Sequence, residues 1–292
     1  MDRIEIESRL LQLDTDIPWT HHFDIGGVRT TSPEADEKFY RKSMGAKRLG
    51  ELALLYTRIF SNSKTIEGLR VLDIASAEGG HSVEFARAGA HEVVGIEGRQ
   101  LYVNRAEFVA EALNISNVRF ELGDVRQMDP AKAGRFDVVL CFGILHHLGE
   151  QDFVPFLRLL GELTSDVLVL YTHVSTSQAV VDFRLAGPRS VGEGLTGYML
   201  REHPDEADQA EREGQVRASL DNTFSFWATE ESLILALKRS GFGFISKVYE
   251  PHIFGGHVNR NLRVIIVAKK VPAVTVEPPR VLASPPSALT QS

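Results

Sequence analysis

The sequence predicts an α/β fold with a doubly wound, seven-stranded and mostly parallel sheet, an N-terminal cap, and an insertion after the fifth strand. Between residues 67 and 270, apolar runs of strand length alternate with segments of helical spacing, which is typical of parallel sheets with crossover helices. The run Val71 to Ile74 breaks into small residues, is followed by a helical pattern, and leads to a second apolar run that ends at Glu97. This order predicts a βαβ unit.

Residues 1–66 precede the alternating pattern and are expected to form a cap or lid. Apolar residues at helical spacing in the first thirteen positions predict a short amphipathic helix that ends before Pro18. The pair Gly26-Gly27 predicts the turn of a short hairpin. Ser32 followed by Pro33 predicts the N-cap and first turn of a long helix that leads into the core.

The core is expected to span residues 67–270. Strands are predicted at about 69–74, 92–97, 117–121, 135–142 and 166–172, with helices between them. A helix from Thr229 to Ser240, with Thr229 as N-cap and Gly241 beyond its end, then precedes two closing strands at Phe244–Tyr249 and Leu262–Lys269. Residues 173–225 lack a regular pattern and are expected to form an irregular insertion on the substrate side. The proline-rich tail, residues 271–292, is predicted to be disordered.

Charge indicates which ligand the βαβ unit suits. A turn that binds pyrophosphate presents glycine amides and a helix N-terminus to a dianion. Here Ala75 and Ala77 occupy two of the glycine positions, and Glu78 lies in the turn. At ~4 Å its carboxylate would repel a pyrophosphate by several times thermal energy. S-adenosylmethionine has an ammonium, a sulfonium and a ribose diol but no phosphate, so the turn favours this methyl donor over a dinucleotide.

With these residues the chain resembles the class I S-adenosylmethionine-dependent methyltransferases. The resemblance rests on Asp73 to Gly79, on Glu97, on the acidic turn Gly123-Asp124-Val125, and on the string from Phe136 to Leu148. This string, with the later Phe226-Trp227-Ala228-Thr229 and Leu233, is similar to a subfamily that includes tRNA wobble-uridine methyl and carboxymethyl transferases and many natural-product methyltransferases. The resemblance implies a Rossmann-like fold whose N-terminal segment covers the carboxyl edge of the sheet.

The same resemblance implies the cofactor contacts. Glu97 should bind the two ribose hydroxyls, Asp124 should accept from the adenine amino group, and the turn after Asp73 should hold the methionine portion. Phe142 and Gly143 should lie beneath the sulfur. The full expected set is Asp73, Ala75, Glu78, Gly79, Glu97, Gly98, Asp124, Val125, Phe142 and Gly143.

Methyl transfer needs a dry pocket with in-line approach, and a base if the acceptor is a hydroxyl. The candidate bases are the histidines near the predicted carboxyl edge and in the cap: His146, His147, His173, His252, His257, His21 and His22, with the first three preferred. Related proteins have tyrosine at the first of these positions and histidine at the second, so His146 is expected to face the acceptor and His147 to be architectural. The residues expected to line the acceptor are Trp19, His21, His22, His252 and His257. No metal is predicted, because His252 and His257 come without a clustered carboxylate.

The charge and hydrophobicity of the chain indicate which partners it could bind. The net charge of −7 disfavours binding to nucleic acid without excluding it. Arginines between 184 and 217 are interleaved with acidic residues, Glu202 among them, which predicts a solvated helical surface. No apolar run reaches about 18 residues, and the charged start indicates a soluble cytoplasmic enzyme without a membrane partner. Cys141, the single cysteine, is expected to be a buried hydrophobe. The oligomeric state stays open.

The predicted function is methyl transfer to a small or medium-sized metabolite, preferentially at oxygen. Modification of a tRNA wobble uridine is the main alternative. A non-catalytic S-adenosylmethionine-binding protein is the second, and it is disfavoured because the ribose and adenine positions are all present.

Overall fold

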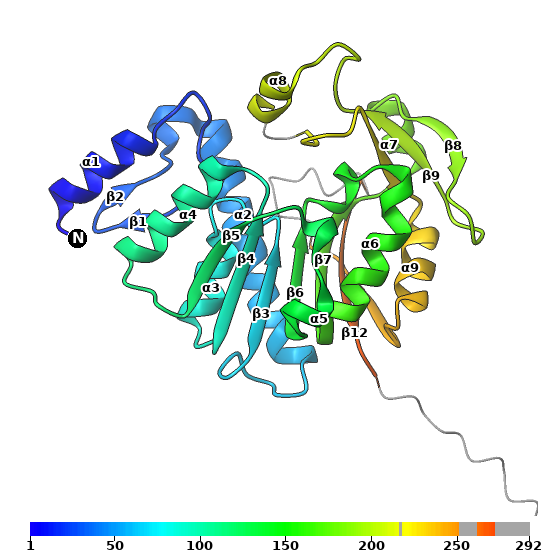
Figure 1. Ribbon diagram of the computed structural model, residues 1–292, viewed down its shortest axis with the longest axis horizontal. Coiled ribbons are helices and arrows are strands. Elements are labelled where there is room, and N and C mark those ends of the chain that lie inside the picture. The colour runs from blue at the N-terminus through cyan, green and yellow to red at the C-terminus, as the bar shows by residue number, and fades with distance from the viewer. Residues whose placement is uncertain (216–217, 251–261, 272–292) are drawn as a thin grey trace, which may run out of the picture.

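The computed structural model describes residues 1–215, 218–250 and 262–271 of the chain. At its centre is a seven-stranded sheet (Figure 1), made of β3 (Arg70–Ile74), β4 (Glu92–Glu97), β5 (Val118–Leu122), β6 (Phe136–Phe142), β7 (Thr164–His173), β11 (Phe244–Val248) and β12 (Arg263–Lys269). Its order is β11-β12-β7-β6-β3-β4-β5. β12 pairs antiparallel with both β11 and β7, and the other neighbouring strands of this sheet pair in parallel. The predicted fold class is confirmed.

Strand register places the functional turns together. Ile74, the last residue of β3, lies opposite Ile96 of β4 and Cys141 of β6. The turn after β3, Glu97 at the end of β4, and the exit of β6 therefore meet at one edge of the sheet, where ligands of open α/β folds bind.

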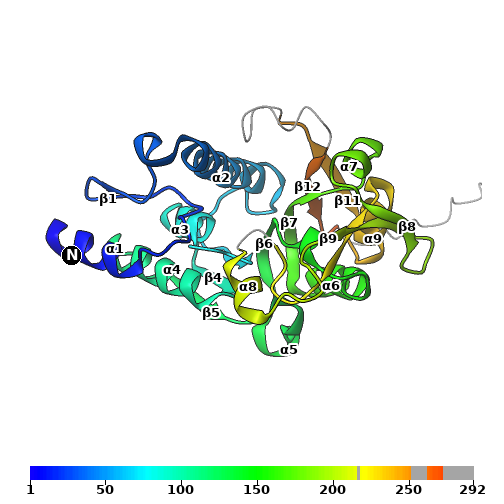
Figure 2. The same ribbon diagram turned by 90° about the horizontal axis from the view of Figure 1, so that it is seen from above.

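Helices cover both faces of the sheet because its strands are apolar on both sides. Leu52 of α2 (Pro33–Phe60) and Phe85 of α3 (Gly80–Arg87) pack on the face that contains Val71. The face that contains Leu72 is covered by α6 (Glu150–Leu163) and α9 (Glu230–Arg239). Figure 2 shows α2 on one side of the sheet, and α6 with the short α5 (Pro130–Ala133) on the other. On β5, Phe120 packs against α4 (Gln100–Ala112).

The elements predicted for the first 66 residues are present. They are α1 (Arg3–Leu13), a hairpin of β1 (Asp24–Ile25) and β2 (Val28–Arg29), and α2. The Ser32 hydroxyl accepts from the Ala35 amide, as an N-cap does, and Pro33 occupies the first turn. These local signals were sufficient because each acts within a few residues of the chain.

The expectation that residues 173–225 are irregular is wrong. This insertion contains α7 (Ser177–Asp182), β8 (Ala186–Ser190), β9 (Thr196–Arg201), α8 (Gln209–Gly214) and β10 (Phe224–Ala228). The three strands form an antiparallel sheet in the order β10-β9-β8, and Figure 1 shows α8 above the carboxyl edge of the main sheet. Gly197 of β9 pairs with Ala228, and a Cβ on Gly197 would lie 2.4 Å from the Trp227 carbonyl oxygen. The glycines that hid these strands in the sequence thus permit close pairing.

Two further expectations concern the tail and membrane-crossing helices. Apart from Val271, the tail predicted to be disordered lies outside the described residues. In the described ranges, no helix is both long and apolar enough to cross a bilayer.

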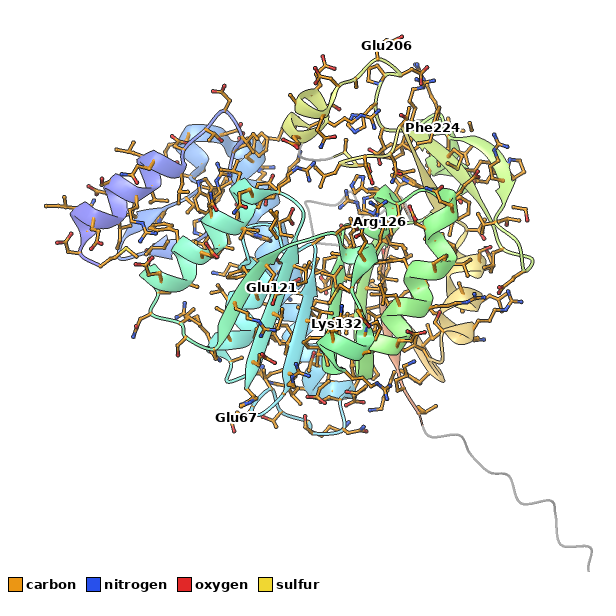
Figure 3. All side chains as sticks on the ribbon, viewed as in Figure 1. Glu67, Glu121, Arg126, Lys132, Glu206 and Phe224 are labelled. Carbon is orange, nitrogen blue, oxygen red and sulfur yellow. The ribbon has the colours of Figure 1, made fainter. Side chains whose placement is uncertain are left out.

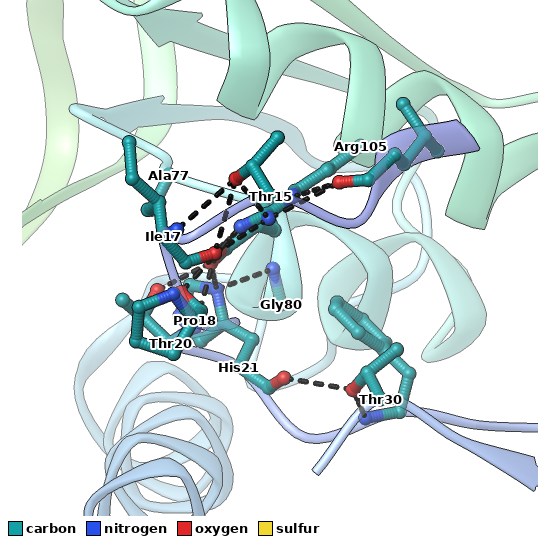
Figure 4. A network of polar contacts seen from close by, with 12 residues as sticks. Thr15, Ile17, Pro18, Thr20, His21, Thr30, Ala77, Gly80 and Arg105 are labelled. Atoms are coloured by element: carbon teal, nitrogen blue, oxygen red, sulfur yellow. Dashed lines mark hydrogen bonds and ion pairs between the residues drawn. The ribbon is translucent and has the colours of Figure 1, made fainter. Parts of the chain in front are cut away.

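Arg105 of α4 joins the N-terminal segment to the core (Figure 4). Its side chain is fully buried and donates to the carbonyl oxygens of Leu13, Ile17 and Pro18, with the Ile17 contact at 2.7 Å. Its guanidinium also lies 3.4 Å from a Glu78 carboxylate oxygen and 4.7 Å from the Trp19 ring centroid. One side chain therefore fixes the path of residues 13–19.

We expect the substitution Arg105→Leu to lower the free energy of unfolding by about 3–5 kcal/mol, because it leaves a buried carboxylate with less compensation. Urea denaturation followed by circular dichroism measures this loss. The matched control is Arg48→Leu, which removes an exposed ion pair with Glu51 and should cost about 1 kcal/mol or less. Equal losses in the two variants would contradict the assigned role of Arg105.

Candidate active site

A cavity of about 510 Å³ lies at the carboxyl edge of the main sheet. Its size suits a small-molecule site. The exits of four parallel strands supply most of its wall, and the N-terminal segment and the insertion supply the rest. The lining residues are Thr20, Ala75, Ala77, Glu97, Gly98, Arg99, Tyr102, Leu122–Arg126, Phe142–Ile144, His147, Leu148, Gln209 and Ala218–Asp221.

The turn after β3 has an uncommon backbone. Ala75 and Ala77 adopt φ of +57° and +47°, in the left-handed region that glycine more often occupies. Gly79, with φ of +74°, precedes α3, and a Cβ there would lie 2.4 Å from the Phe120 ring. Glycine at 79 therefore lets the turn lie directly against the sheet. The Ala77 amide donates to Glu97 across the turn at 2.9 Å.

Glu97 combines burial with spare hydrogen-bonding capacity. The residue is 5% exposed, and its two carboxylate oxygens accept from the amides of Ala77 and Arg99, each at 2.9 Å. Burial raises the pKa of Glu97, while these two amide hydrogen bonds oppose the rise. Each oxygen keeps a lone pair for another donor. Two adjacent hydroxyls, such as those of a ribose, fit this arrangement.

Tyr102 supplies a second group suited to a ligand. Its residue is 3% exposed, its hydroxyl has no hydrogen-bond partner within the described chain, and it lines the cavity. Burial raises the pKa of this hydroxyl, which therefore stays a donor at neutral pH. A buried hydroxyl without a partner is costly, so a polar ligand at this place would be favoured. The sequence analysis missed Tyr102, although its position in the first turn of the helix after Glu97 is a usable signal.

The carboxylate of Asp124 is engaged by an arginine side chain. It accepts from the Arg126 amide at 2.9 Å and from the Arg126 guanidinium at 2.8 Å, and Arg126 also pairs with Asp152 and Asp221. Burial alone would raise the pKa of Asp124, but the hydrogen bonds and charge of Arg126 outweigh it and lower that pKa. Figure 3 shows Arg126 near the carboxyl edge of the sheet and Glu67 at the opposite edge. An adenine amino group could bind Asp124 only by sharing it with Arg126.

Residues 218–221 of the insertion form a roof over the cavity. Arg99 donates to the Ala218 carbonyl oxygen at 3.3 Å, and Asp221 pairs with Arg126. Leu220 approaches Gly98 so closely that a Cβ on Gly98 would lie 2.6 Å from its side chain. Sequence reasoning expected Gly98 at the site but gave no signal for these partners, which are 95 or more residues apart in the sequence.

Three residues expected to contact the cofactor do not line the cavity: Asp73, Glu78 and Gly79. Glu78 is fully buried, accepts from the Thr20 amide at 3.0 Å, and lies 3.2 Å from His21 Nδ1. Its carboxylate therefore turns toward the N-terminal segment and away from the cavity, which corrects the expectation that it confronts the ligand. Asp73 accepts from the Ser82 hydroxyl at 2.6 Å, and burial raises its pKa to about 6.

The structure places the two adjacent histidines differently from this expectation. His147 lines the cavity, with Nδ1 2.7 Å from Glu202 Oε1. His146 is buried behind it, with Nδ1 3.2 Å from the Thr172 hydroxyl, and it does not line this cavity. Burial lowers the pKa of His146 well below its usual value. Both residues lie on one tight 3₁₀ turn, Leu145–His147, and their rings contact each other while their Nδ1 atoms have different partners.

His173 has both ring nitrogens engaged. Nδ1 contacts the Leu262 carbonyl oxygen at 3.0 Å, and Nε2 accepts from Arg263 at 2.6 Å. Burial and the Arg263 charge lower the pKa of His173 to about 2. No nitrogen is left to take a proton from an acceptor, so this candidate base has a structural position.

The residues expected to bind the acceptor are scattered. Trp19 is buried in an apolar cluster with Phe23. His21 and His22 line a separate cavity of about 180 Å³. His252 and His257 lie outside the described residues. Within residues 1–215, 218–250 and 262–271, no group of three or more metal-binding side chains is arranged to hold an ion.

Comparisons with known proteins agree with this geometry. Residues 66–175 match the family model of a methyltransferase domain. The chain is 28% identical over 130 residues to a ubiquinone biosynthesis O-methyltransferase of Neisseria meningitidis serogroup C, covering 44% of this chain and 54% of that protein. It is 27% identical over 127 residues to a tRNA U34 carboxymethyltransferase of Alteromonas mediterranea, covering 39% and 37%. The chain thus spans about half the length, or less, of these curated relatives.

A solved structure matches over a longer range. The N-terminal domain of EvdMO1, crystallised in the presence of S-adenosylhomocysteine and D-fucose, superposes with a TM-score of 0.67 at 26% identity, covering 93% of this chain and 98% of that one. The fold and the site thus match those of the class I S-adenosylmethionine-dependent methyltransferases. The expected family and cofactor are confirmed.

We expect Glu97→Ala to weaken binding of S-adenosylhomocysteine about ten- to a hundred-fold, because the two hydroxyl contacts of a ribose would be lost. Isothermal titration calorimetry measures this directly. Glu121→Ala, which alters an exposed carboxylate paired with Arg119, is the matched control and should bind normally. Unchanged affinity in Glu97→Ala would refute the ribose contact.

The pair of His21 and Glu78 predicts a pH dependence of stability. Burial alone lowers the pKa of His21, but the hydrogen bond and charge of Glu78 outweigh it and raise that pKa above 6.5. A raised histidine pKa stabilises the fold below the unfolded value, and the contribution is lost as pH rises through the folded value. The difference in unfolding free energy between wild type and His21→Asn should therefore shrink as the pH rises above about 6.5.

Urea titrations at several pH values test this expectation. His91→Asn, at an exposed histidine, is the control for loss of a histidine outside this pair. A His21→Asn difference that grows with pH would show that the ring is not held in its charged form.

Proposed function

We propose that this chain is an S-adenosylmethionine-dependent O-methyltransferase whose acceptor is a small molecule with a hydroxyl group. The observation that carries the proposal is the position of His147. Its ring lines the same cavity as Glu97, Phe142 and Gly143, and one ring nitrogen is already bound to a buried carboxylate. The other nitrogen is therefore available to a group in the cavity.

Methyl transfer to a hydroxyl requires that the acceptor oxygen lose its proton. When bound, S-adenosylmethionine supplies a methyl group on a positively charged sulfur, which keeps the S–C bond pair as the acceptor oxygen forms the new C–O bond. The oxygen loses its proton, and His147 Nε2 is the group we assign to take it. The buried wall formed by Phe142 and Leu148 favours the transfer by keeping water from the reacting atoms.

The similar proteins support a small acceptor. One relative is named for O-methylation in ubiquinone biosynthesis, and the solved EvdMO1 domain was crystallised in the presence of a sugar, D-fucose. We therefore favour hydroxylated ring compounds, sugars or phenols, as the class to examine first.

Modification of tRNA is the second candidate, because one relative is a tRNA U34 carboxymethyltransferase. The net charge of −7 counts against it, since enzymes that hold an RNA backbone usually present a basic face. A small-molecule acceptor agrees better with this charge.

We expect His147→Ala to lower turnover by ~10²- to 10⁴-fold, the range for loss of a general base. Affinity for S-adenosylhomocysteine should stay within about twofold, because the ring serves the acceptor. The measurement is transfer of labelled methyl from S-adenosylmethionine to a panel of sugars and phenols, with total tRNA as a separate arm. His91→Ala is the control on an exposed histidine. Labelling of tRNA alone, or full turnover in His147→Ala, would overturn the proposal.

A further inference from the structure

Glu202, a residue of the insertion, places its buried carboxylate beside the His147 ring at the cavity. Glu202 follows directly after β9, and its side chain is only 4% exposed. Its Oε1 lies 2.7 Å from His147 Nδ1 and also accepts from the hydroxyl of Ser225, a fully buried residue of β10. The sequence had placed Glu202 on a solvated surface, because its charged neighbours conceal it. We infer that Glu202 is the positioning residue of His147; this inference rests on the proposed function.

A carboxylate imposes one tautomer on the imidazole. An ionised glutamate can only accept hydrogen bonds, so a neutral ring beside it must carry its proton on Nδ1. The lone pair then lies on Nε2, the nitrogen that is free to take a proton from an acceptor. The Ser225 hydroxyl is a further donor to Glu202 and helps to hold the carboxylate in place.

The insertion also holds the backbone of His147. The Asn222 side-chain amide donates to the His147 carbonyl oxygen at 3.1 Å, while the His147 amide donates to the Ile144 carbonyl oxygen at 2.8 Å. The ring and the main chain of His147 are thus both fixed by residues 202–225. A ring held from two directions keeps its orientation while ligands exchange.

The two histidines packed beside this ring, His146 and His173, are themselves neutral. The rings of His146 and His147 are 4.3 Å apart, and burial keeps His146 neutral by lowering its pKa. His173 packs behind His146 at 4.6 Å, and burial and Arg263 keep it neutral as well. Within the described chain, Glu202 is the carboxylate paired with His147. It would therefore balance the imidazolium formed when His147 takes the hydroxyl proton.

The test is the tautomer of His147 in the full-length protein, labelled with ¹⁵N-histidine and saturated with S-adenosylhomocysteine. Long-range ¹H–¹⁵N spectra distinguish protonated from unprotonated ring nitrogens, and loss of signals in His147→Gln assigns the ring. We expect the proton on Nδ1 in the wild type and a shift toward Nε2 in Glu202→Leu. Asp205→Leu, at an exposed acidic residue paired with Arg201, is the matched control and should leave the His147 signals unchanged.

In the wild-type spectrum, a proton on His147 Nε2 would overturn the inference. This result does not depend on whether Glu202→Leu folds. An Nδ1 proton that persists in a folded Glu202→Leu protein would overturn the inference too. With any acceptor that turns over, Glu202→Leu should lower kcat by roughly 10²-fold or more with little change in KM. Loss of activity in His147→Ala but not in Glu202→Leu would refute only the positioning role. Full activity in His147→Ala would refute the proposed function itself.

Discussion

The buried carboxylate of Glu78 is the constraint on which the rest of the site depends. It lies in the turn after β3 and takes hydrogen bonds or charge from Thr20, His21 and Arg105, which come from two distant parts of the chain. A buried charge is tolerated only with such compensation, so the N-terminal segment must lie against the turn. That contact places Thr20 on the cavity wall and keeps the left-handed backbone of Ala75 and Ala77 in position.

The cavity is built from polar groups of two kinds. Asp73 and Glu78 have their hydrogen bonds satisfied within the protein and hold its parts together. Glu97 and Tyr102 are nearly as buried but keep unused capacity, and both face the cavity. Because an unsatisfied buried group is unfavourable, the second kind marks where a ligand is favoured.

Sequence reasoning was most successful where the decisive forces are local. Strand alternation, the cap at Ser32 and the carboxylate at the end of β4 all act within a few residues, and they predicted the sheet and the place of Glu97. It did not find the partners of Glu78 and Glu202, because Thr20 lies 58 residues from Glu78 and His147 lies 55 residues from Glu202. It also could not distinguish His146 from His147, because neighbours on one tight turn point to different surroundings.

Arg126 gives the cavity a property that no single contact describes. One guanidinium holds Asp124 on the wall and Asp221 in the roof, with Asp152 as a third partner. Two sites that share one cation are thermodynamically linked. If a ligand that draws on Asp124 changes the hold of Arg126 on Asp221 by some factor, then opening the roof changes the affinity for that ligand by the same factor. The affinity for the ligand and the closure of the roof would then share a single coupling free energy.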